Sequence, residues 1–234
     1  MKAVILSFIL LTLKGSGDAP LIENCWKFNQ LNTSVRDGKA NREQIVSQIR
    51  DCLNDIRSEM PKSQTDKEWA FPVEGYDAKA IGGKNGNGYQ SKGYLYLDGN
   101  KHKAHPAHDI FIEDRNQDCR DDRTGKRVKI KSVTDGTVVA QVAVWNPGSA
   151  LRGGKYVMVY HPKEDLISYY AHLDSTVVHP GQIVGRGELL GFLGRTGLNA
   201  WKKRSPTHLH LMILKTDDKQ AFVPVNPYSK WKLK

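Results

Sequence analysis

Residues 207–214 read Thr-His-Leu-His-Leu-Met-Ile-Leu, and they give the plainest strand signal in the chain. Side chains two positions apart in a β-strand lie on the same face. His208 and His210 therefore point to one side, and Leu209 and Leu211 point to the other side, toward a core. The stretch predicts a β-strand that carries a pair of histidines on one face.

Further short β-rich runs occur beyond Val128, and tight turns separate them. The turn signals include Thr134-Asp135-Gly136, Asn146-Pro147-Gly148 and His179-Pro180-Gly181. No helical stretch interrupts the series, so the sequence predicts a mainly β fold built on an antiparallel sheet. The predicted strands cover residues 128–130, 137–145, 156–160, 166–173, 188–193 and 208–214.

The amino-terminal third differs from the rest in composition. One lysine precedes an apolar run in residues 1–17, which is typical of a secretory signal peptide and too short for a stable membrane span. Apolar residues then recur at helical spacing from Asn41 to Met60, with Asn41 and Gln44 resembling a capping box and Pro61 ending the helix. We therefore expect a signal peptide (1–17), a small helical segment (18–68) and one main domain (69–234).

The chain is basic, with 35 Lys and Arg against 25 Asp and Glu among 234 residues. This excess favours anionic partners such as bacterial wall polymers. The basic residues are scattered rather than gathered in a stripe, and no nucleic-acid-binding motif accompanies them, so no nucleic acid partner is expected. The sequence gives no prediction of the oligomeric state.

Three cysteines leave two interpretations open. Export would permit a disulfide between Cys25 and Cys52, with Cys119 left over. In the alternative, all three are small, half-buried side chains.

Metal chemistry is the function that the histidines indicate. His105 and Asp109 are four positions apart, so they share one side of an extended segment or of a helical turn. His108 has the wrong parity to join them, and His161 and His179, next to prolines, are interpreted as surface residues. Two histidines and one carboxylate around zinc, with a fourth position open, form a catalytic rather than a structural site.

The chain resembles the lysostaphin-type zinc metallopeptidases, a family of peptidoglycan endopeptidases, over roughly residues 69–228. Six motifs occur in the order that is typical of this family. They are His105 to Asp109, residues 135–139 (Asp-Gly-Thr-Val-Val), residues 170–173 (Tyr-Ala-His-Leu), residues 178–182 (Val-His-Pro-Gly-Gln), residues 191–197 (Gly-Phe-Leu-Gly-Arg-Thr-Gly) and residues 207–210 (Thr-His-Leu-His).

The resemblance implies one zinc ion per chain, held by His105, Asp109 and His210. It also implies that His172 and His208 face the reacting carbonyl, one as proton acceptor and the other stabilising the oxyanion, without deciding which does which. The expected reaction is hydrolysis of peptide bonds by a zinc-activated water. The expected substrate is a peptidoglycan cross-link or another peptide, and the expected location is periplasmic or extracellular.

The chain departs from the family pattern in two places. The glycine that is usual between the first two ligands is missing from residues 105–109. An acidic insertion at residues 114–122 resembles a calcium-binding loop, although Cys119 stands where glycine is favoured and Gly125 replaces the final glutamate. A calcium site and a solvated acidic loop both remain as interpretations, and the candidate calcium ligands are Asp114, Asn116, Asp118 and Asp122.

Two other functions compete with catalysis. Relatives of this family that have lost their zinc ligands serve as wall-binding or hydrolase-activating scaffolds, but this chain keeps all three expected ligands and both supporting histidines. A calcium-binding adhesion or structural protein would make the acidic loop central and the histidines incidental. We favour catalysis because the side chains for an open zinc site are present.

Overall fold

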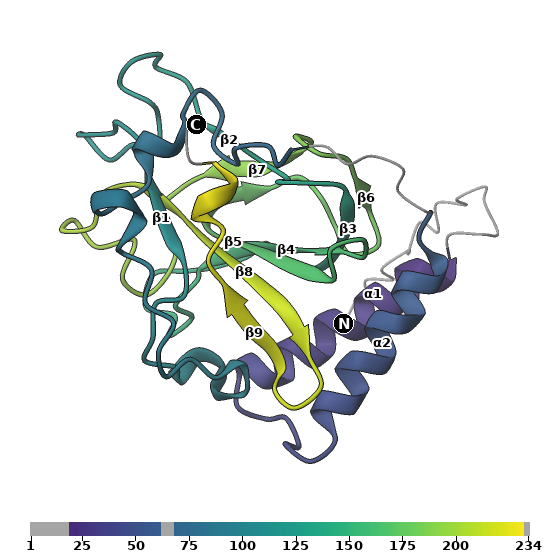
Figure 1. Cartoon of the computed structure of the whole chain (residues 1–234). Coiled ribbons are helices and arrows are strands. Elements are labelled where there is room, and N and C mark those ends of the chain that lie inside the picture. The colour runs from purple at the N-terminus through teal and green to yellow at the C-terminus, as the bar shows by residue number, and fades with distance from the viewer. Residues whose placement is uncertain (1–18, 62–67, 232–234) are drawn as a thin grey trace, which may run out of the picture.

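A computed structural model describes residues 19–61 and 68–231; the predicted signal peptide, residues 1–17, lies outside the described residues. Two helices come first, α1 (Ala19–Arg36) and α2 (Ile45–Glu59), and they lie side by side against the sheet (Figure 1). Within the described residues, no helix combines the length and the apolar character needed to cross a membrane.

Helix α2 confirms the predicted amino-terminal helix, but its start differs from the predicted capping box. Gln44 is the N-cap residue, and its side chain makes no capping hydrogen bond. The side chain of Asn41 instead accepts a hydrogen bond from the backbone N–H of Glu43 at 3.0 Å, which forms a turn before the helix.

In the described part of the chain nine strands form one antiparallel sheet, which confirms the predicted fold class. Neighbouring strands follow the order β1-β8-β5-β4-β3-β6, with β7 paired to β5 and β2, and β9 paired to β8. The strands are β1 (His108–Phe111), β2 (Lys129–Lys131), β3 (Gly136–Val142), β4 (Lys155–His161), β5 (Leu166–Thr176), β6 (Ile183–Val184), β7 (Leu189–Leu193), β8 (His208–Asp217) and β9 (Ala221–Val225).

Six of these strands match the predicted runs to within a few residues. The three that the sequence did not predict are β1, β6 and β9. Strands β1 and β6 span only four and two residues, too few for an alternating pattern to be recognised. Strand β9 contains Pro224, and a proline argues against a strand because it lacks a backbone N–H. At the edge of the sheet, where β9 lies, proline is tolerated.

The sheet has a hydrophobic core on each face. In β8, Leu209 and Leu211 lie in the core that faces β2, β6 and β7. Met212 and Leu214 lie in the other core, together with the buried residues of α1 and α2. His208 and His210 alternate with Leu209 and Leu211, so they lie on the helix-covered side, as the strand pattern predicts.

Helix α1 is part of that second core rather than a separate lobe. Its residues at three- and four-residue intervals are buried, including Phe28, which packs edge-to-face on Phe222 of β9. Cys25 and Cys52 are buried and not bonded to each other, so the disulfide interpretation does not hold. Burial raises the pKa of each thiol to about 11, which keeps both protonated at neutral pH.

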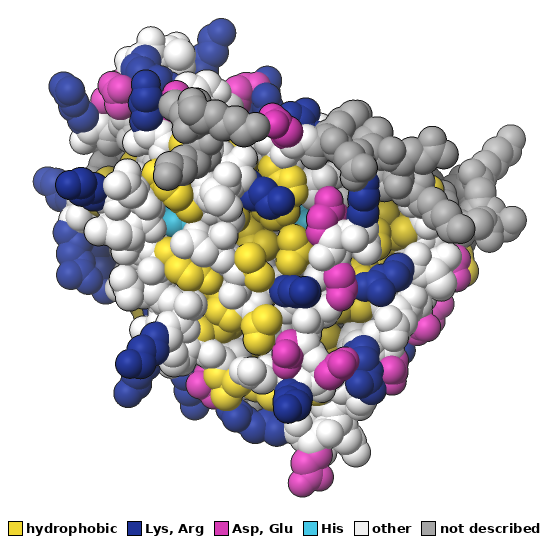
Figure 2. Space-filling model, viewed as in Figure 1, with side chains coloured by type: hydrophobic (Ala, Val, Ile, Leu, Met, Phe, Trp, Pro, Cys, Tyr) yellow, Lys and Arg dark blue, Asp and Glu magenta, His cyan; other side chains and the backbone are white. Residues whose placement is uncertain are grey.

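Charged side chains lie mostly on the outside of this arrangement. On the face seen in Figure 2, Lys and Arg are spread among acidic, apolar and uncharged side chains. Basic surface of this kind adds a long-range attraction for anionic partners.

Candidate metal centre

Three side chains that the sequence singled out converge at the junction of β1 and β8. The ligand atoms of His105, Asp109 and His210 all lie within 4.8 Å of one another. Oδ1 of Asp109 is 3.2 Å from Nε2 of His105 and 3.1 Å from Nδ1 of His210. Among the described residues this is the one group of three or more His, Cys, Asp or Glu side chains arranged to hold a metal ion.

Backbone pairing fixes the position of each of the three. Asp109 lies directly opposite His210 in the antiparallel register of β1 and β8. His105 pairs with Gln90 through two backbone hydrogen bonds of 2.8 Å, although the segment is too short to count as a strand. The site therefore rests on backbone hydrogen bonds from three separate segments.

The protonation of His105 shows why a cation belongs between these groups. Nδ1 of His105 lies 3.2 Å from the carbonyl oxygen of Gly88, which only accepts, so Nδ1 carries a proton. In a neutral imidazole Nε2 then carries a lone pair, which faces the carboxylate of Asp109. The lone pair of Nε2 and the carboxylate oxygen repel each other unless a proton or a metal ion lies between them.

The donor set and spacing fit zinc. Zinc accepts histidine nitrogen and carboxylate oxygen at about 2.0–2.2 Å, so two tetrahedral ligands lie about 3.3 Å apart. The observed separations of 3.1 and 3.2 Å agree with that value. His105 and Asp109 are partly exposed, with 38% and 27% of their side-chain surface accessible, so solvent reaches the site.

Electrostatics keep the carboxylate charged. Burial alone would raise the pKa of Asp109, but hydrogen bonds from His105 and His210 outweigh it and hold that pKa far below the usual range. The hydrogen bond to Asp109 raises the pKa of His105, whereas burial lowers that of His210. An anionic Asp109 beside a neutral His210 is the state that metal binding needs.

His172 reaches the same site through an unusual backbone conformation. It lies in β5 with φ of +66°, a left-handed value that a non-glycine residue seldom adopts. Its N–H donates to the carbonyl of Gly153 at 2.9 Å. The twist turns the imidazole toward the metal centre, where its ring centroid lies 5.6 Å from that of His210. Backbone strain of this kind is typical of functional sites.

The glycine-rich motif at residues 191–197 contacts the imidazole of His172 and holds it in place. Thr196 accepts the Nδ1 proton of His172 at its carbonyl oxygen, 2.8 Å away. Gly197 has φ of +114°, and a Cβ there would lie 2.9 Å from Nδ1 of His172 and 2.3 Å from the carbonyl oxygen of Arg152. The motif therefore needs glycine at this position because the backbone passes so close to the histidine.

His172 and His208 share one tautomer. Nδ1 of His208 lies 2.7 Å from the carbonyl oxygen of Pro206, so it too carries the proton. Each ring is then left with an Nε2 lone pair, and Nε2 of His208 lies 3.8 Å from Oδ1 of Asp109. The two ring centroids are 5.0 Å apart. Burial, followed by the nearby His208 and His210, lowers the pKa of His172 well below its ordinary value.

The remaining histidines lie outside the centre. His108 is buried on the opposite side of β1, with Nε2 2.8 Å from Oδ1 of Asn226, in agreement with its parity in the strand. The surface interpretation of His161 is wrong. This residue is fully buried at the end of β4, with Nδ1 2.9 Å from the carbonyl of Asp135 and Nε2 2.7 Å from Oγ of Ser168. His179 is exposed, as predicted.

The acidic insertion gives no support for calcium. Asp114 is buried, and its carboxylate accepts the backbone N–H groups of Asp118 and Cys119 at 3.1 and 3.0 Å and the hydroxyl of Thr207 at 2.6 Å. Asp122 accepts the N–H of Arg115 at 3.0 Å. The oxygens that a calcium ion would need are therefore used by the loop itself, and they tie it to the start of β8.

The metal centre opens into a cavity of about 320 Å³ on the helix-covered face of the sheet. Arg152 and Tyr169 also line this cavity, and no sequence motif predicted a role for either. A Cβ at Gly153 would lie 1.8 Å from the hydroxyl of Tyr169, so the glycine makes room for that side chain. The Arg152-Gly153-Gly154 stretch was the available signal, although glycine pairs are common in ordinary turns.

A protein-family model matches the part of the chain that contains five of the six motifs. Residues 120–227 match the model of peptidase family M23. The match includes His172, His208 and His210, and it begins after His105 and Asp109. No curated protein sequence matches the chain.

Solved structures with a similar fold include several peptidases. A zinc-containing peptidase from Vibrio cholerae is 22% identical, with a TM-score of 0.41 over 70% of this chain and 39% of that one. The catalytic domain of lysostaphin from Staphylococcus simulans is 20% identical, with a TM-score of 0.39 over 58% of this chain and 82% of that one. An M23 peptidase from Pseudomonas aeruginosa is 18% identical, with a TM-score of 0.44 over 94% and 65%. The match to peptidase family M23 thus covers 108 of the 234 residues, and it coincides with strands β2 to β9 of the antiparallel sheet.

Proposed function

We propose that the chain is an exported zinc endopeptidase that hydrolyses peptide bonds, with peptidoglycan cross-links as its substrate. The observation that carries the proposal is the convergence of His105, Asp109 and His210, whose spacing suits a zinc ion. The match of residues 120–227 to peptidase family M23 supports the reaction type.

The metal would be held by Nε2 of His105, a carboxylate oxygen of Asp109 and Nδ1 of His210. When bound, zinc lowers the pKa of a water from 15.7 to about 7 and polarises the substrate carbonyl. The partial exposure of His105 and Asp109 leaves room for that water and for the peptide. One zinc ion per chain accounts for all three side chains.

His172 and His208 would handle the protons. Both rings carry Nδ1–H bound to a backbone carbonyl, so each presents a free Nε2 that can accept a proton from water. Once protonated, either ring can donate to the oxyanion of the tetrahedral intermediate or to the leaving amine. Both are catalytic residues in this proposal, and their division of labour stays open.

The reaction balances without a further reactant. The peptide C–N bond breaks, the acyl carbon gains the oxygen of water, and the nitrogen leaves with a proton. Each histidine only relays protons, so both are restored at the end of a turnover.

Export and domain division are part of the same proposal. The signal peptide at residues 1–17 would deliver the protein to the periplasm or the outside of the cell, where the wall is found. Residues 69–234 would form the peptidase domain and residues 18–68 the helical segment, whose helices α1 and α2 cover one face of the sheet. The positive net charge of +10 favours the anionic wall polymer as partner, and no nucleic acid partner is proposed.

Digestion of purified bacterial wall tests the proposal. The zinc-loaded protein should release soluble fragments with new peptide termini that mass spectrometry identifies, and a chelator should stop the release. Intact wall after incubation with the zinc-loaded protein would contradict the proposed substrate. A protein that binds wall without zinc and cuts nothing would instead match the scaffold function.

A further inference from the structure

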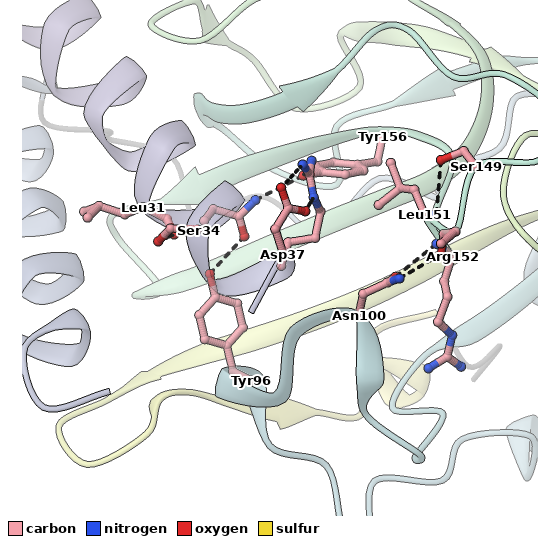
Figure 3. A network of polar contacts seen from close by, with 12 residues as sticks. Leu31, Ser34, Asp37, Tyr96, Asn100, Ser149, Leu151, Arg152 and Tyr156 are labelled. Carbon is pink, nitrogen blue, oxygen red and sulfur yellow. Dashed lines mark hydrogen bonds and ion pairs between the residues drawn. The ribbon is translucent and has the colours of Figure 1, made fainter. Parts of the chain in front are cut away.

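The cavity that contains the metal centre extends to α1, whose Asn32, Val35 and Arg36 line it. Asn32 donates to the hydroxyl of Tyr156 at 3.1 Å and accepts from the hydroxyl of Tyr96 at 2.9 Å, so α1, β4 and the turn at residues 96–101 are joined there (Figure 3). Gly99 touches the end of α1 so closely that a Cβ there would lie 2.2 Å from the carbonyl oxygen of Val35. The helix therefore forms one wall of the cavity.

The size of the cavity limits what it can hold. Its volume of about 320 Å³ includes the metal centre and lies at the lower end of the roughly 300–1,000 Å³ of small-ligand pockets. A volume of this size has room for only a residue or two of a peptide beside the metal centre. The cavity therefore suits a substrate whose chain ends close to the bond that is cut.

One arginine of this cavity has no acidic partner among the described residues. Arg152 lines it, and no carboxylate of residues 19–61 or 68–231 forms an ion pair with its guanidinium. The other lining arginine, Arg36, is bound by the carboxylate of Asp37, with Nε 2.7 Å from Oδ1 and Nη2 3.1 Å from Oδ2. Asp109, which belongs to the metal centre, is the one acidic residue of the lining, so the cavity attracts an anionic group.

Two hydrogen bonds fix the position of Arg152 and leave most of its guanidinium N–H donors free. Its N–H donates to Oδ1 of Asn100 at 3.0 Å (Figure 3), and its Nη1 donates to the carbonyl of His102. A guanidinium has five N–H donors in a planar fork that suits a carboxylate, and this one bond leaves four of them available. The bond to the carbonyl of His102 places the guanidinium beside the segment that leads to His105.

We propose that Arg152 binds a free carboxylate of the substrate, so that the bond that is cut lies within one or two residues of that carboxylate. The proposal rests on the peptidase function and narrows its substrate class. Suitable substrates are peptides with a free carboxyl terminus, or branched peptides with a carboxylate beside the scissile bond. Arg152 acts here as a specificity-determining residue, because the carboxylate that it binds is remote from the reacting carbonyl.

Binding of a small carboxylate tests the proposal without any turnover. The zinc-loaded full chain, labelled with ¹⁵N-arginine, is titrated with N-acetyl-glycylglycine and separately with its amide. The acid should shift the Nε–H signal of Arg152 and bind about tenfold or more tightly than the amide, because a charge-assisted bond is lost in the amide. Equal responses to acid and amide, or no response of Arg152, would overturn the proposal.

Turnover provides a second readout. Acetylated random hexapeptides are supplied with a free carboxyl terminus and, separately, as amides. The wild type should cut the acids near the carboxyl terminus at least about tenfold faster than the amides, Arg152→Gln should lose this preference, and Arg152→Lys should keep part of it. Arg50→Gln, at an exposed position on α2, is the matched control and should keep the wild-type preference.

The two readouts separate this proposal from the peptidase function. If the zinc-loaded protein cuts neither library nor bacterial wall, the peptidase function fails, and the titration still decides whether Arg152 binds a carboxylate. If it cuts acids and amides equally well at scattered positions, the peptidase function stands and the carboxylate subsite is refuted. Circular dichroism and zinc content of the Arg152 variants, both expected to match the wild type, show that a changed preference is not a folding defect.

Discussion

Asp109 of β1 and His210 of β8 lie directly opposite each other in the sheet, with Oδ1 of the aspartate 3.1 Å from Nδ1 of the histidine. His105 approaches the same oxygen from a separate backbone bridge. The pocket for the cation is therefore set by strand register and does not depend on a flexible loop. A site held in this way keeps its geometry before the metal arrives.

The two histidines of β8 should respond differently to substitution. His210→Ala removes a metal ligand and should abolish zinc binding. His208→Ala should keep the zinc but lower turnover by about 10² to 10⁴-fold, because a group that relays protons is lost. Zinc content and the rate of peptide release measure the two effects, and equal zinc loss in both variants would contradict the assignment.

Gly197→Ala should lower activity without removing the metal. The new Cβ would lie 2.3 Å from the carbonyl of Arg152 and 2.9 Å from Nδ1 of His172, so the imidazole must move. A displacement of about 1 Å can cost about 10²-fold in rate. Turnover and zinc content of the variant are compared with those of Gly185→Ala, where the nearest atom is 3.6 Å away. Wild-type turnover in Gly197→Ala would show that the position of His172 is unimportant.

Helix α1 should contribute to the stability of the whole domain. Phe28 is fully buried against Phe222, so Phe28→Ala should lower the free energy of unfolding by about 3–5 kcal/mol. Trp26 lies on the same helix with 46% of its surface exposed, and Trp26→Ala should change that free energy by less than about 1 kcal/mol. Denaturant titration measures both. A separate early transition for α1 and α2 would contradict a shared core.

His161 should make the protein less stable in mild acid. Burial lowers the pKa of His161 to about 4, against 6.5 in the unfolded chain. Between these values the unfolded state binds a proton that the folded state does not, so the free energy of unfolding falls as the pH drops from 6.5 to about 4. Above pH 6.5 the contribution of His161 to stability is fully present. This one residue would account for a loss of about 3 kcal/mol.

The variant His161→Asn tests that origin. It should lose stability at all pH values but show a shallower fall between pH 6.5 and 4 in denaturant titrations, because one proton uptake is removed. His179→Asn, at an exposed position, should keep the wild-type slope. An unchanged slope in His161→Asn would mean that other groups cause the acid sensitivity.

The sequence predicted the sheet because its long strands alternate or run apolar for five residues or more. It predicted a helical segment over residues 18–68 but located a helix only at Asn41 to Met60, although Leu21, Cys25, Phe28, Asn32 and Val35 of α1 are spaced at intervals of three and four. Two members of that face are a cysteine and an asparagine, so the apolar period is interrupted. Asn32 is buried because it joins the hydroxyls of Tyr96 and Tyr156, which are 64 and 124 residues away.

The same reasoning explains the outcome at the site. Parity within a strand was enough to place His208 and His210 on one face and to separate His108 from Asp109. Parity did not predict the burial of His161, because this burial depends on contacts with Ser168 and Asp135 in neighbouring segments. A role for Arg152 could not be predicted for a similar reason, since it depends on the lack of an acidic partner among the described residues of the folded cavity.

X-ray absorption at the zinc edge of the purified, zinc-loaded protein tests the central claim most directly. The account predicts about one zinc per chain, with two imidazole nitrogens at about 2.0–2.1 Å and oxygen ligands at about 2.0–2.2 Å. The signal should be absent from His210→Ala. Failure to retain zinc, or a spectrum with sulfur at about 2.3 Å from the cysteines, would contradict a centre built from His105, Asp109 and His210.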